Sequence, residues 1–298
     1  MRAVVFREYG SPDVLRVEDV DTPEPGPGQV RLRVRAAGVN RFDCKVRAGA
    51  FRAALPRTPG FEVAGVVDAV GAGVTGLAVG DEVFGFADSG GYAEYALATV
   101  VAPKPAGLGW DEAVALPNAG ETAQRVLGLL GLEAGETLLV HGASGAVGGV
   151  AVQLAAVRGA TVIGTASPAN HDYLRSLGVV PVAYGDHLVE RVHALAPHGI
   201  DAVFDTAGKG ALPDSIALRG GRTERIVTIA DGAAAEELGV TASFKAERSV
   251  DGLAELARLA VEGKLRVEVA RVFALDEAPA AHAQAETGHT RGKLVLRP

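Results

Sequence analysis

The segment Leu138–Leu154, LLVHGASGAVGGVAVQL, joins an apolar strand, a run of small residues and an apolar helix without interruption. Small residues let the backbone approach a pyrophosphate, and a helix N-terminus offers free N–H groups and the positive end of a dipole. The spacing Ala143-x-Gly145-x-x-Gly148 is a variant of the G-x-G-x-x-G turn in its required strand–turn–helix context. The segment predicts a dinucleotide-binding turn, with a tight turn that holds no ligand as the alternative. Its residues are Ala143, Ser144, Gly145, Ala146, Val147 and Gly148.

The same region imitates a membrane span, because no charged residue occurs from Thr137 to Val157. The Gly145/Gly149 spacing also resembles a helix-pairing motif of membrane proteins. Polar residues and glycines interrupt the segment, however, and a buried strand, a turn and a buried helix explain it better. The N-terminus, MRAVVFREYG, has no apolar run of the length that a secretory signal needs. We therefore expect a cytoplasmic protein that does not enter the membrane.

Charge and cysteine content exclude several classes of protein. The 298 residues carry 29 Lys and Arg against 36 Asp and Glu, which gives a net charge of −7. A nucleic-acid-binding protein usually needs a basic surplus to displace counterions, so we expect no nucleic-acid partner. A single cysteine, Cys44, excludes an intramolecular disulfide and any cysteine-rich zinc or iron–sulfur site.

Two regions of different pattern divide the chain. Up to about residue 110, short strands alternate with turn residues, which is typical of a mainly β domain. After Pro117, apolar runs alternate with helical patterns, and such alternation builds a parallel sheet with right-handed crossovers. After Leu265 the pattern returns to strands, and the last of them, Lys293–Leu296, is expected to rejoin the first region. The prediction is an α/β chain with a mainly β domain over residues 1–117 and 264–298, and a doubly wound parallel sheet over residues 118–263.

The end of the second strand after the glycine turn, TVIGTASPAN, bears on the choice of dinucleotide. A site specific for NAD usually has an acid here to accept from the ribose 2′-hydroxyl. This chain has Thr165, Ala166 and Ser167 instead, and its nearest acid, Asp172, comes several residues too late. Ser167 and Asn170 could donate hydrogen bonds to a 2′-phosphate, so the sequence predicts NADPH. A site indifferent to the phosphate is the alternative.

Several motifs in the correct order resemble the medium-chain dehydrogenase/reductase superfamily, in its zinc-free quinone oxidoreductase branch. They are AAGVNRFDCKVRAG near residue 40, PGFEVAGVVDAVG from Pro59, VGDEVFGF, GGYAEY, NAGETAQRVL, the glycine turn and the final RGKLVL. The resemblance covers nearly the whole chain. It implies a GroES-like β domain and a Rossmann domain, with the cofactor in the cleft between them.

In this chain, other residues stand at positions where the zinc-containing members of the superfamily have metal ligands. Their cysteine in G-x-C-x-x-D corresponds to Asn40 in GVNRFD, and their histidine in PGHE corresponds to Phe61 in PGFE. Only Glu62 of that cluster remains, and a catalytic zinc ion needs about three protein ligands. Cys44 follows the motif and does not match a ligand, so it is interpreted as a small buried hydrophobe. We predict no metal site.

The resemblance implies hydride transfer from NADPH to a quinone or an α,β-unsaturated carbonyl compound, which needs orientation more than a Lewis acid. Asn40 would lie near the nicotinamide, as a hydrogen-bond partner of the ribose or the substrate carbonyl or as a residue that only holds its loop. A non-catalytic NADPH-binding protein that acts as a redox sensor or regulator is the alternative function. Further cofactor contacts carried over from the family are Thr122, Tyr184, Ala207, Ile229 and Lys293, the last toward the pyrophosphate.

The segment Val240–Phe244, VTASF, reads as a late strand near the open edge of the parallel sheet. Uncapped edge strands with apolar side chains tend to pair, and in the resembling family two subunits often join there. We therefore expect a homodimer. The charged residues that follow, Lys245, Glu247 and Arg248, could instead guard the edge and keep the chain monomeric.

Overall fold

The computed structural model describes residues 1–288 and 290–298, which divide into two compact units. Unit 1 contains Met1–Asn118, Arg248–Gly263 and Val267–Pro298, and unit 2 contains Ala119–Glu247 and Lys264–Arg266. The sequence placed residues 248–263 with the parallel sheet, whereas here they belong to unit 1. Their helix α9 (Val250–Val261) packs against strand β7 (Val101–Pro103) of that unit, which explains the difference.

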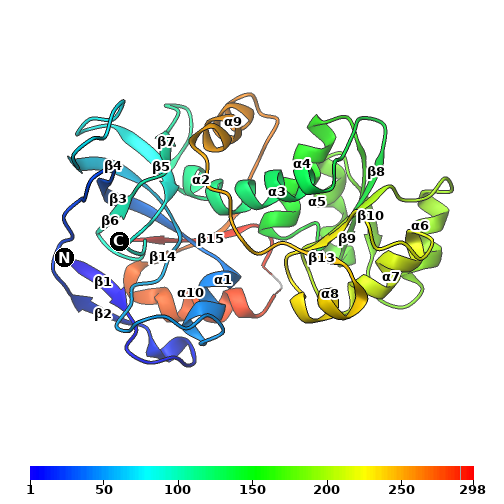
Figure 1. The fold of residues 1–298 in the computed structure, drawn as a ribbon, viewed down its shortest axis with the longest axis horizontal. Coiled ribbons are helices and arrows are strands. Elements are labelled where there is room, and N and C mark those ends of the chain that lie inside the picture. Colours follow the sequence, from blue (N-terminus) through cyan, green and yellow to red (C-terminus); the bar gives the residue numbers. More distant parts are fainter. Residues whose placement is uncertain (289) are drawn as a thin grey trace. The chain divides into compact units, whose positions relative to one another are not determined.

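Unit 2 is built on a parallel sheet of six strands in the order β10-β9-β8-β11-β12-β13 (Figure 1). This is the order 3-2-1-4-5-6 of a Rossmann sheet, and the prediction of a doubly wound parallel sheet is confirmed. The inner strands are buried along nearly their whole length, because helices cover both faces. The strands are β8 (Thr137–His141), β9 (Thr161–Ala166), β10 (Val180–Ala183), β11 (Ala202–Asp205), β12 (Ile226–Thr228) and β13 (Thr241–Ala242).

Helices connect successive strands of this sheet. They are α3 (Pro117–Leu129), which leads into unit 2, α4 (Ala146–Val157), α5 (His171–Ser176), α6 (Leu188–Leu195), α7 (Ala211–Leu218) and α8 (Gly232–Leu238). The uncharged segment from Thr137 to Val157 is β8, the glycine turn and α4, as expected for buried elements. Within residues 1–288 and 290–298, no helix has the length and apolarity needed to cross a bilayer.

Unit 1 contains a sheet of seven strands in the order β14-β15-β3-β4-β5-β7, with β6 paired to β3, and a separate β1–β2 ribbon. Its strands are β1 (Arg2–Val5), β2 (Arg16–Asp19), β3 (Val30–Val39), β4 (Glu62–Val70), β5 (Glu82–Phe86), β6 (Tyr95–Ala98), β7 (Val101–Pro103), β14 (Val269–Ala274) and β15 (Lys293–Arg297). Its helices are α1 (Arg41–Arg47), α2 (Trp110–Val114), α9 and α10 (Ala278–Glu286). Alternating side chains such as Leu32, Val67 and Leu296 form its core.

The register of three adjacent strands sets up the site in unit 1. Strand β15 pairs antiparallel with β3, so that Leu294 lies opposite Val39. Strand β3 also pairs antiparallel with β4, in a register with Ala37 opposite Val63. The next residues along these strands are therefore neighbours: Lys293 beside Asn40, and Glu62 beside Gly38. The predicted return of the final strand to the first region is confirmed.

Strand β13 forms one edge of the parallel sheet, which confirms the predicted edge position of this segment. The strand is shorter than the sequence indicated, since only Thr241 and Ala242 have strand geometry and both are exposed. Phe244, just beyond the strand, is 51% exposed.

Candidate active site and nucleotide-binding turn

The glycine turn after β8 requires small residues at two close approaches. A Cβ atom on Gly148 would lie 2.2 Å from the carbonyl oxygen of Gly142 and 2.8 Å from Cα of Ala143. Gly142 itself has φ of +73°, and a Cβ there would meet the hydroxyl of Thr206 at 2.8 Å. Only residues without a side chain let the first turn of α4 and the end of β11 lie this near the end of β8.

The N-terminus of α4 is open for an anion. Gly145 is its N-cap residue and supplies no side-chain hydrogen bond to the first helical turn. The N–H groups of Ala146, Val147 and Gly148 belong to this first turn, where the helix offers them no internal acceptor. Donors of this kind, at the positive end of a helix dipole, bind phosphate groups.

Asp205, which the sequence reasoning missed, organises the neighbouring strand ends. Its buried carboxylate accepts hydrogen bonds from the N–H of Ala207 at 3.0 Å and from the hydroxyl of Thr228 at 2.7 Å. Its carbonyl oxygen accepts from the N–H of Ile229 at 3.0 Å. Ala207 and Ile229 thus lie at the carboxyl ends of β11 and β12. An acid at the end of an apolar strand was the signal, because a buried carboxylate needs several donors.

The residues predicted to face a 2′-phosphate form one polar cluster. The amide nitrogen of Asn170 donates to the hydroxyl of Ser144 at 3.3 Å and to the hydroxyl of Ser167 at 3.2 Å. Thr165 fixes β9 to the turn, since its hydroxyl accepts from the N–H of Gly142 at 3.1 Å. The structure therefore brings the turn and the end of β9 together at three hydrogen-bonding side chains.

Asp172, the acidic residue nearest in sequence to the end of β9, is exposed to solvent. The carboxylate of Asp172 has 98% of its surface exposed and pairs with Arg175 at 2.6 Å, one turn along the same helix.

Two other predicted cofactor contacts lie on separate elements of unit 2. Thr122 is buried in α3, where its hydroxyl donates to Glu121 at 3.3 Å, and Tyr184 is 57% exposed just after β10.

Unit 1 holds a buried charged cluster around Asn40. The ammonium group of Lys293 forms an ion pair with the carboxylate of Glu62, and these side chains are 1% and 0% exposed. Lys293 also donates to Oδ1 of Asn40 at 2.6 Å. Asn40 donates from Nδ2 to Oε1 of Glu62 at 2.9 Å, and Glu62 accepts from the N–H of Asn118 at 2.8 Å. The pairing of Glu62 with Lys293 and the part of Asn118 were not foreseen.

Asn40 occupies the N-cap position of α1, yet its side chain does not cap the helix. An N-cap asparagine usually accepts from a backbone N–H of the first turn. Here Oδ1 accepts from Lys293 and, at 2.9 Å, from the amide of Asn118, while Asp43 accepts from the N–H of Asn40 at 2.7 Å. A role confined to capping the start of α1 therefore does not explain this side chain.

Asp43 links the cluster to a second buried group. Burial raises the pKa of Asp43 to about 7, although its carboxylate accepts from the N–H groups of Asn40 and Gly60. Tyr92 and His282, both fully buried, share a hydrogen bond of 3.2 Å nearby. The thiol of Cys44 donates to the carbonyl of His282, and burial raises its pKa to about 12, as expected for a small buried hydrophobe.

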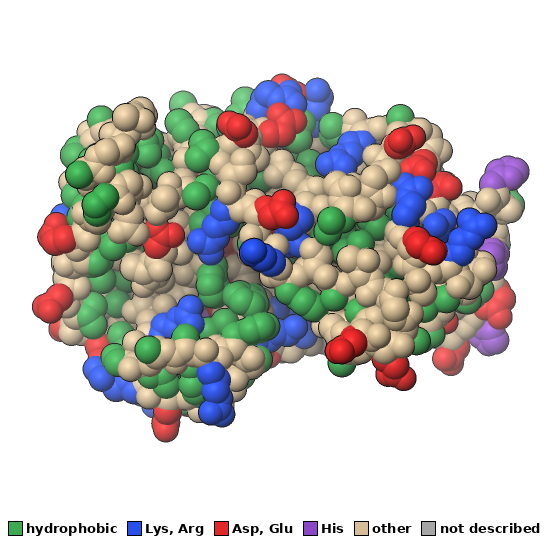
Figure 2. Space-filling view, viewed as in Figure 1, with side chains coloured by type: hydrophobic (Ala, Val, Ile, Leu, Met, Phe, Trp, Pro, Cys, Tyr) green, Lys and Arg blue, Asp and Glu red, His purple; other side chains and the backbone are tan. Residues whose placement is uncertain are grey.

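Three aromatic rings pack together, and two of them are close to this cluster in sequence, since Phe42 follows Asn40 by two residues and Phe61 precedes Glu62. The ring of Phe42 lies 4.8 Å from that of Phe61 and 5.0 Å from that of Phe51, centroid to centroid. Phe42 and Phe51 are 38% and 46% exposed. Hydrophobic side chains gather around α1 on the face that Figure 2 shows. A partly exposed cluster of tilted aromatic rings thus begins two residues from Asn40.

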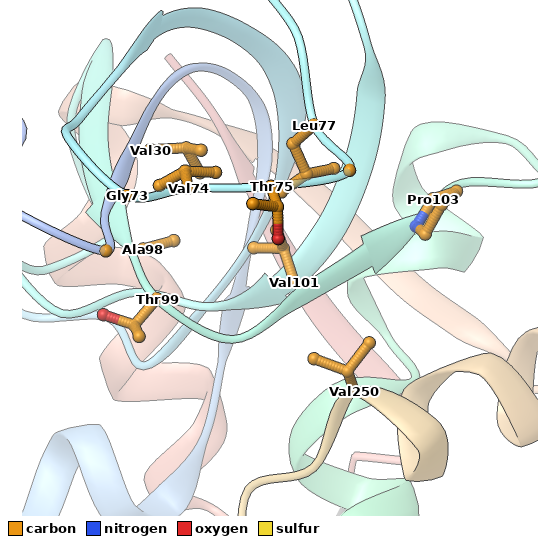
Figure 3. A pocket seen from close by; sticks show the side chains of 12 residues that line it. Val30, Gly73, Val74, Thr75, Leu77, Ala98, Thr99, Val101, Pro103 and Val250 are labelled. Atoms are coloured by element: carbon orange, nitrogen blue, oxygen red, sulfur yellow. The ribbon is translucent and has the colours of Figure 1, made fainter.

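Unit 1 also has a hollow of about 350 Å³ (Figure 3). Its wall includes Val74, Leu77 and Val101, and Val250 of α9 contributes from the other side. None of its lining residues is titratable and none is a predicted site residue. Among the residues that the structure describes, no group of three or more His, Cys, Asp or Glu side chains could hold a metal ion.

Comparisons with known proteins agree with both units. Residues 26–106 match the family model described as alcohol dehydrogenase GroES-like domain, and residues 177–296 match that described as zinc-binding dehydrogenase. The chain is 34% identical to an NADPH-dependent alkenal/one oxidoreductase, chloroplastic, of Arabidopsis thaliana, and the match covers 100% of this chain and 80% of that protein.

Solved structures give the same fold over the whole chain. A quinone oxidoreductase from Coxiella burnetii is 33% identical with a TM-score of 0.90, over 100% of this chain and 99% of that one. A mycobacterial protein complexed with NADPH is 30% identical with a TM-score of 0.88, over 100% of both chains. A structure named NAD-dependent alcohol dehydrogenase, 33% identical with a TM-score of 0.88 over 100% of both chains, shows that the fold alone does not set the reaction.

The glycine turn generates a stability prediction. Gly148→Ala should lower the melting temperature, because its Cβ meets backbone atoms at 2.2 Å and 2.8 Å that only a shift of α4 can relieve. Gly128→Ala is the matched control, since Gly128 lies in α3 with no atom within 4 Å of the added Cβ. There the substitution should stabilise by about 0.5–1 kcal/mol. Equal melting temperatures for the two variants in a calorimetric scan would contradict the close approach.

Proposed function

Because the chain belongs to the quinone oxidoreductase branch of the medium-chain dehydrogenase/reductase superfamily, we propose that it reduces quinones or α,β-unsaturated carbonyl compounds without zinc. The chain is an oxidoreductase and its cofactor is NADPH. The observation that carries the finer proposal is the ion pair of Glu62 with Lys293. Glu62 is the one residue that remains of the zinc-binding cluster of the zinc-containing members, and the lysine ammonium already compensates its charge.

The residues of unit 2 fit NADPH. The glycine turn admits a close backbone approach, the open N-terminus of α4 offers N–H donors to the pyrophosphate, and Ser144, Ser167 and Asn170 offer polar atoms to a 2′-phosphate. When bound, NADPH supplies the hydride. The further contacts proposed for it are Ala143, Gly145, Ala146, Val147, Gly148, Ala207, Ile229, Thr122 and Tyr184. Lys293, which the resemblance placed toward the pyrophosphate, is instead held by Glu62 and Asn40.

Asn40 and the aromatic side chains close to it in sequence support the proposed substrate class. A simple alcohol needs a Lewis acid and a base for its oxidation, whereas conjugation in a quinone or enone delocalises the charge that arrives with a hydride. Orientation is then the main requirement. The amide of Asn40 can donate a hydrogen bond to a carbonyl oxygen, and the exposed rings of Phe42 and Phe51 suit a planar conjugated substrate.

The cofactor preference is tested by titration of fluorescence with NADPH and NADH. We expect NADPH to bind at least about tenfold more tightly, or roughly 1.4 kcal/mol, a modest gain for hydrogen bonds to a charged phosphate. Ser167→Ala should reduce this preference without abolishing NADH binding. The matched control is Ser176→Ala, because the hydroxyl of Ser176 donates to the carbonyl of Tyr173 within α5. This variant should leave the preference unchanged. Equal dissociation constants for the two cofactors in the wild-type protein would refute the assignment.

The reaction is tested on the purified protein before and after dialysis against a chelator. As purified it should contain no stoichiometric zinc, and after dialysis it should still reduce 1,4-quinones or activated C=C bonds with NADPH and show little oxidation of small alcohols with NADP⁺. Asn40→Ala should lower kcat more than it weakens NADPH binding if the amide acts on the substrate carbonyl. Loss of NADPH affinity alone would make Asn40 a ribose ligand. Activity that disappears with one zinc ion per chain, or strong alcohol oxidation, would overturn the mechanism.

The exposed edge strand β13 supports the proposal of a homodimer. Ser243 donates its N–H inward to the carbonyl of Thr228, so the preceding N–H, of Ala242, faces the open side of the sheet. An unpaired edge of this kind tends to pair with a second copy. Light scattering at micromolar concentration should give a dimer, and Ala242→Pro, which removes the outward donor, should give a monomer. A monomeric wild-type protein would contradict the proposal.

A further inference from the structure

We propose that Lys293 and Glu62 are positioning residues that fix the orientation of the Asn40 amide, so that one of its N–H bonds is presented to the substrate carbonyl. This inference rests on the proposed reduction of quinones or enones. It differs from a contact between Lys293 and the cofactor pyrophosphate, because the lysine acts through Asn40 and touches neither cofactor nor substrate.

The orientation follows from the donors and acceptors around the amide. A lysine ammonium can only donate, and an ionised carboxylate can only accept. Lys293 therefore requires Oδ1 of Asn40 on its side, and Glu62 requires Nδ2 on the other. The reversed amide would place an N–H against the ammonium and an oxygen against the carboxylate, and both contacts would repel.

The hydrogen bonds of the Asn40 amide leave one N–H donor for the substrate. Oδ1 accepts from Lys293 at 2.6 Å and from Asn118 at 2.9 Å, which uses both of its lone pairs. Nδ2 carries two hydrogens, and one of them is donated to Glu62 at 2.9 Å. Within residues 1–288 and 290–298, no acceptor is assigned to the other. Asn40 is partly exposed, whereas the lysine and glutamate behind it are almost fully buried, so this amide group is the part of the cluster that can meet a ligand.

The fold makes room for the carboxylate that completes the cluster. Gly38 lies opposite Glu62 between β3 and β4, and a Cβ atom on Gly38 would be 2.2 Å from Oε1 of Glu62. The glycine has no unusual backbone angle that would require it. Its absent side chain is explained by the space that the carboxylate occupies. The charged pair can thus be disturbed sterically, by Gly38→Ala, without removal of either charge.

The experiment compares Lys293→Met, Glu62→Gln and Gly38→Ala in the full chain. Each is expected to lower kcat for a 1,4-quinone by about tenfold or more, while the dissociation constant of NADPH stays within about twofold. Lys104→Met is the matched control, because Lys104 is also nearly buried and pairs with Glu82 at 3.0 Å in the same unit. The control should lose stability and keep its kcat.

A second readout does not depend on turnover. Protein labelled with ¹⁵N-asparagine should show a resolved side-chain NH₂ pair for Asn40, assigned by its loss in Asn40→Ala. This pair should shift or broaden in the three test variants and stay unchanged in Lys104→Met. Gly38→Ala keeps the inference testable where a charge variant fails to fold.

Three results would overturn the inference. If Lys293→Met weakens NADPH binding and leaves kcat intact, the lysine is a pyrophosphate ligand. If all three variants retain wild-type kcat, the orientation of the amide does not matter to the reaction. If the Asn40 signals do not respond to any of them, the pair does not hold the amide. A wild-type protein that reduces no quinone or enone contradicts the proposed function instead, and the labelled amide still reports on the network.

Discussion

The buried ion pair of Lys293 with Glu62 is the interaction on which the proposed chemistry depends. Removal of two charges from water is costly, and their attraction offsets the cost only with good geometry and further hydrogen bonds. Here the carboxylate accepts from Asn40 and Asn118 in addition to the lysine. Glu62 lies in β4, and its partners come from β15 and from the starts of α1 and α3. The pair therefore requires that several elements of unit 1 meet at one point, and any strand slip would leave a charge alone.

Much of the fold could be predicted from the sequence because local pattern and final environment agree. Strands β5, β8 and β11 are short apolar runs bounded by turn residues or polar positions, and this local pattern is sufficient to predict a strand. The glycine turn could also be predicted, because its glycines are required by backbone contacts that are local in the chain. The alternation after Pro117 indicated the parallel sheet, whose strand order only the structure gives.

The parts of the fold and of the site that could not be predicted depend on contacts between residues that are distant in sequence. Helix α1 follows Asn40 over only seven residues, RFDCKVR, which is too short for helical periodicity to identify. Helix α9 has a clear helical pattern, yet its membership of unit 1 is decided by packing on β7. The partners of Asn40 lie 22, 78 and 253 residues away. A charged residue within an apolar strand signals a buried partner, but the pairing of Glu62 with Lys293 emerges only from strand register.

The last of these separations has a consequence for synthesis of the protein. Glu62 and Asn40 leave the ribosome early, and the whole parallel sheet is made before β15 supplies Lys293. Until then β3 lacks its neighbour β15, and the carboxylate lacks its counter-charge. Unit 2 draws almost all of its residues from one continuous stretch, so it can complete its core during translation. Unit 1 closes afterwards, and the site around Asn40 is finished in the last step of folding.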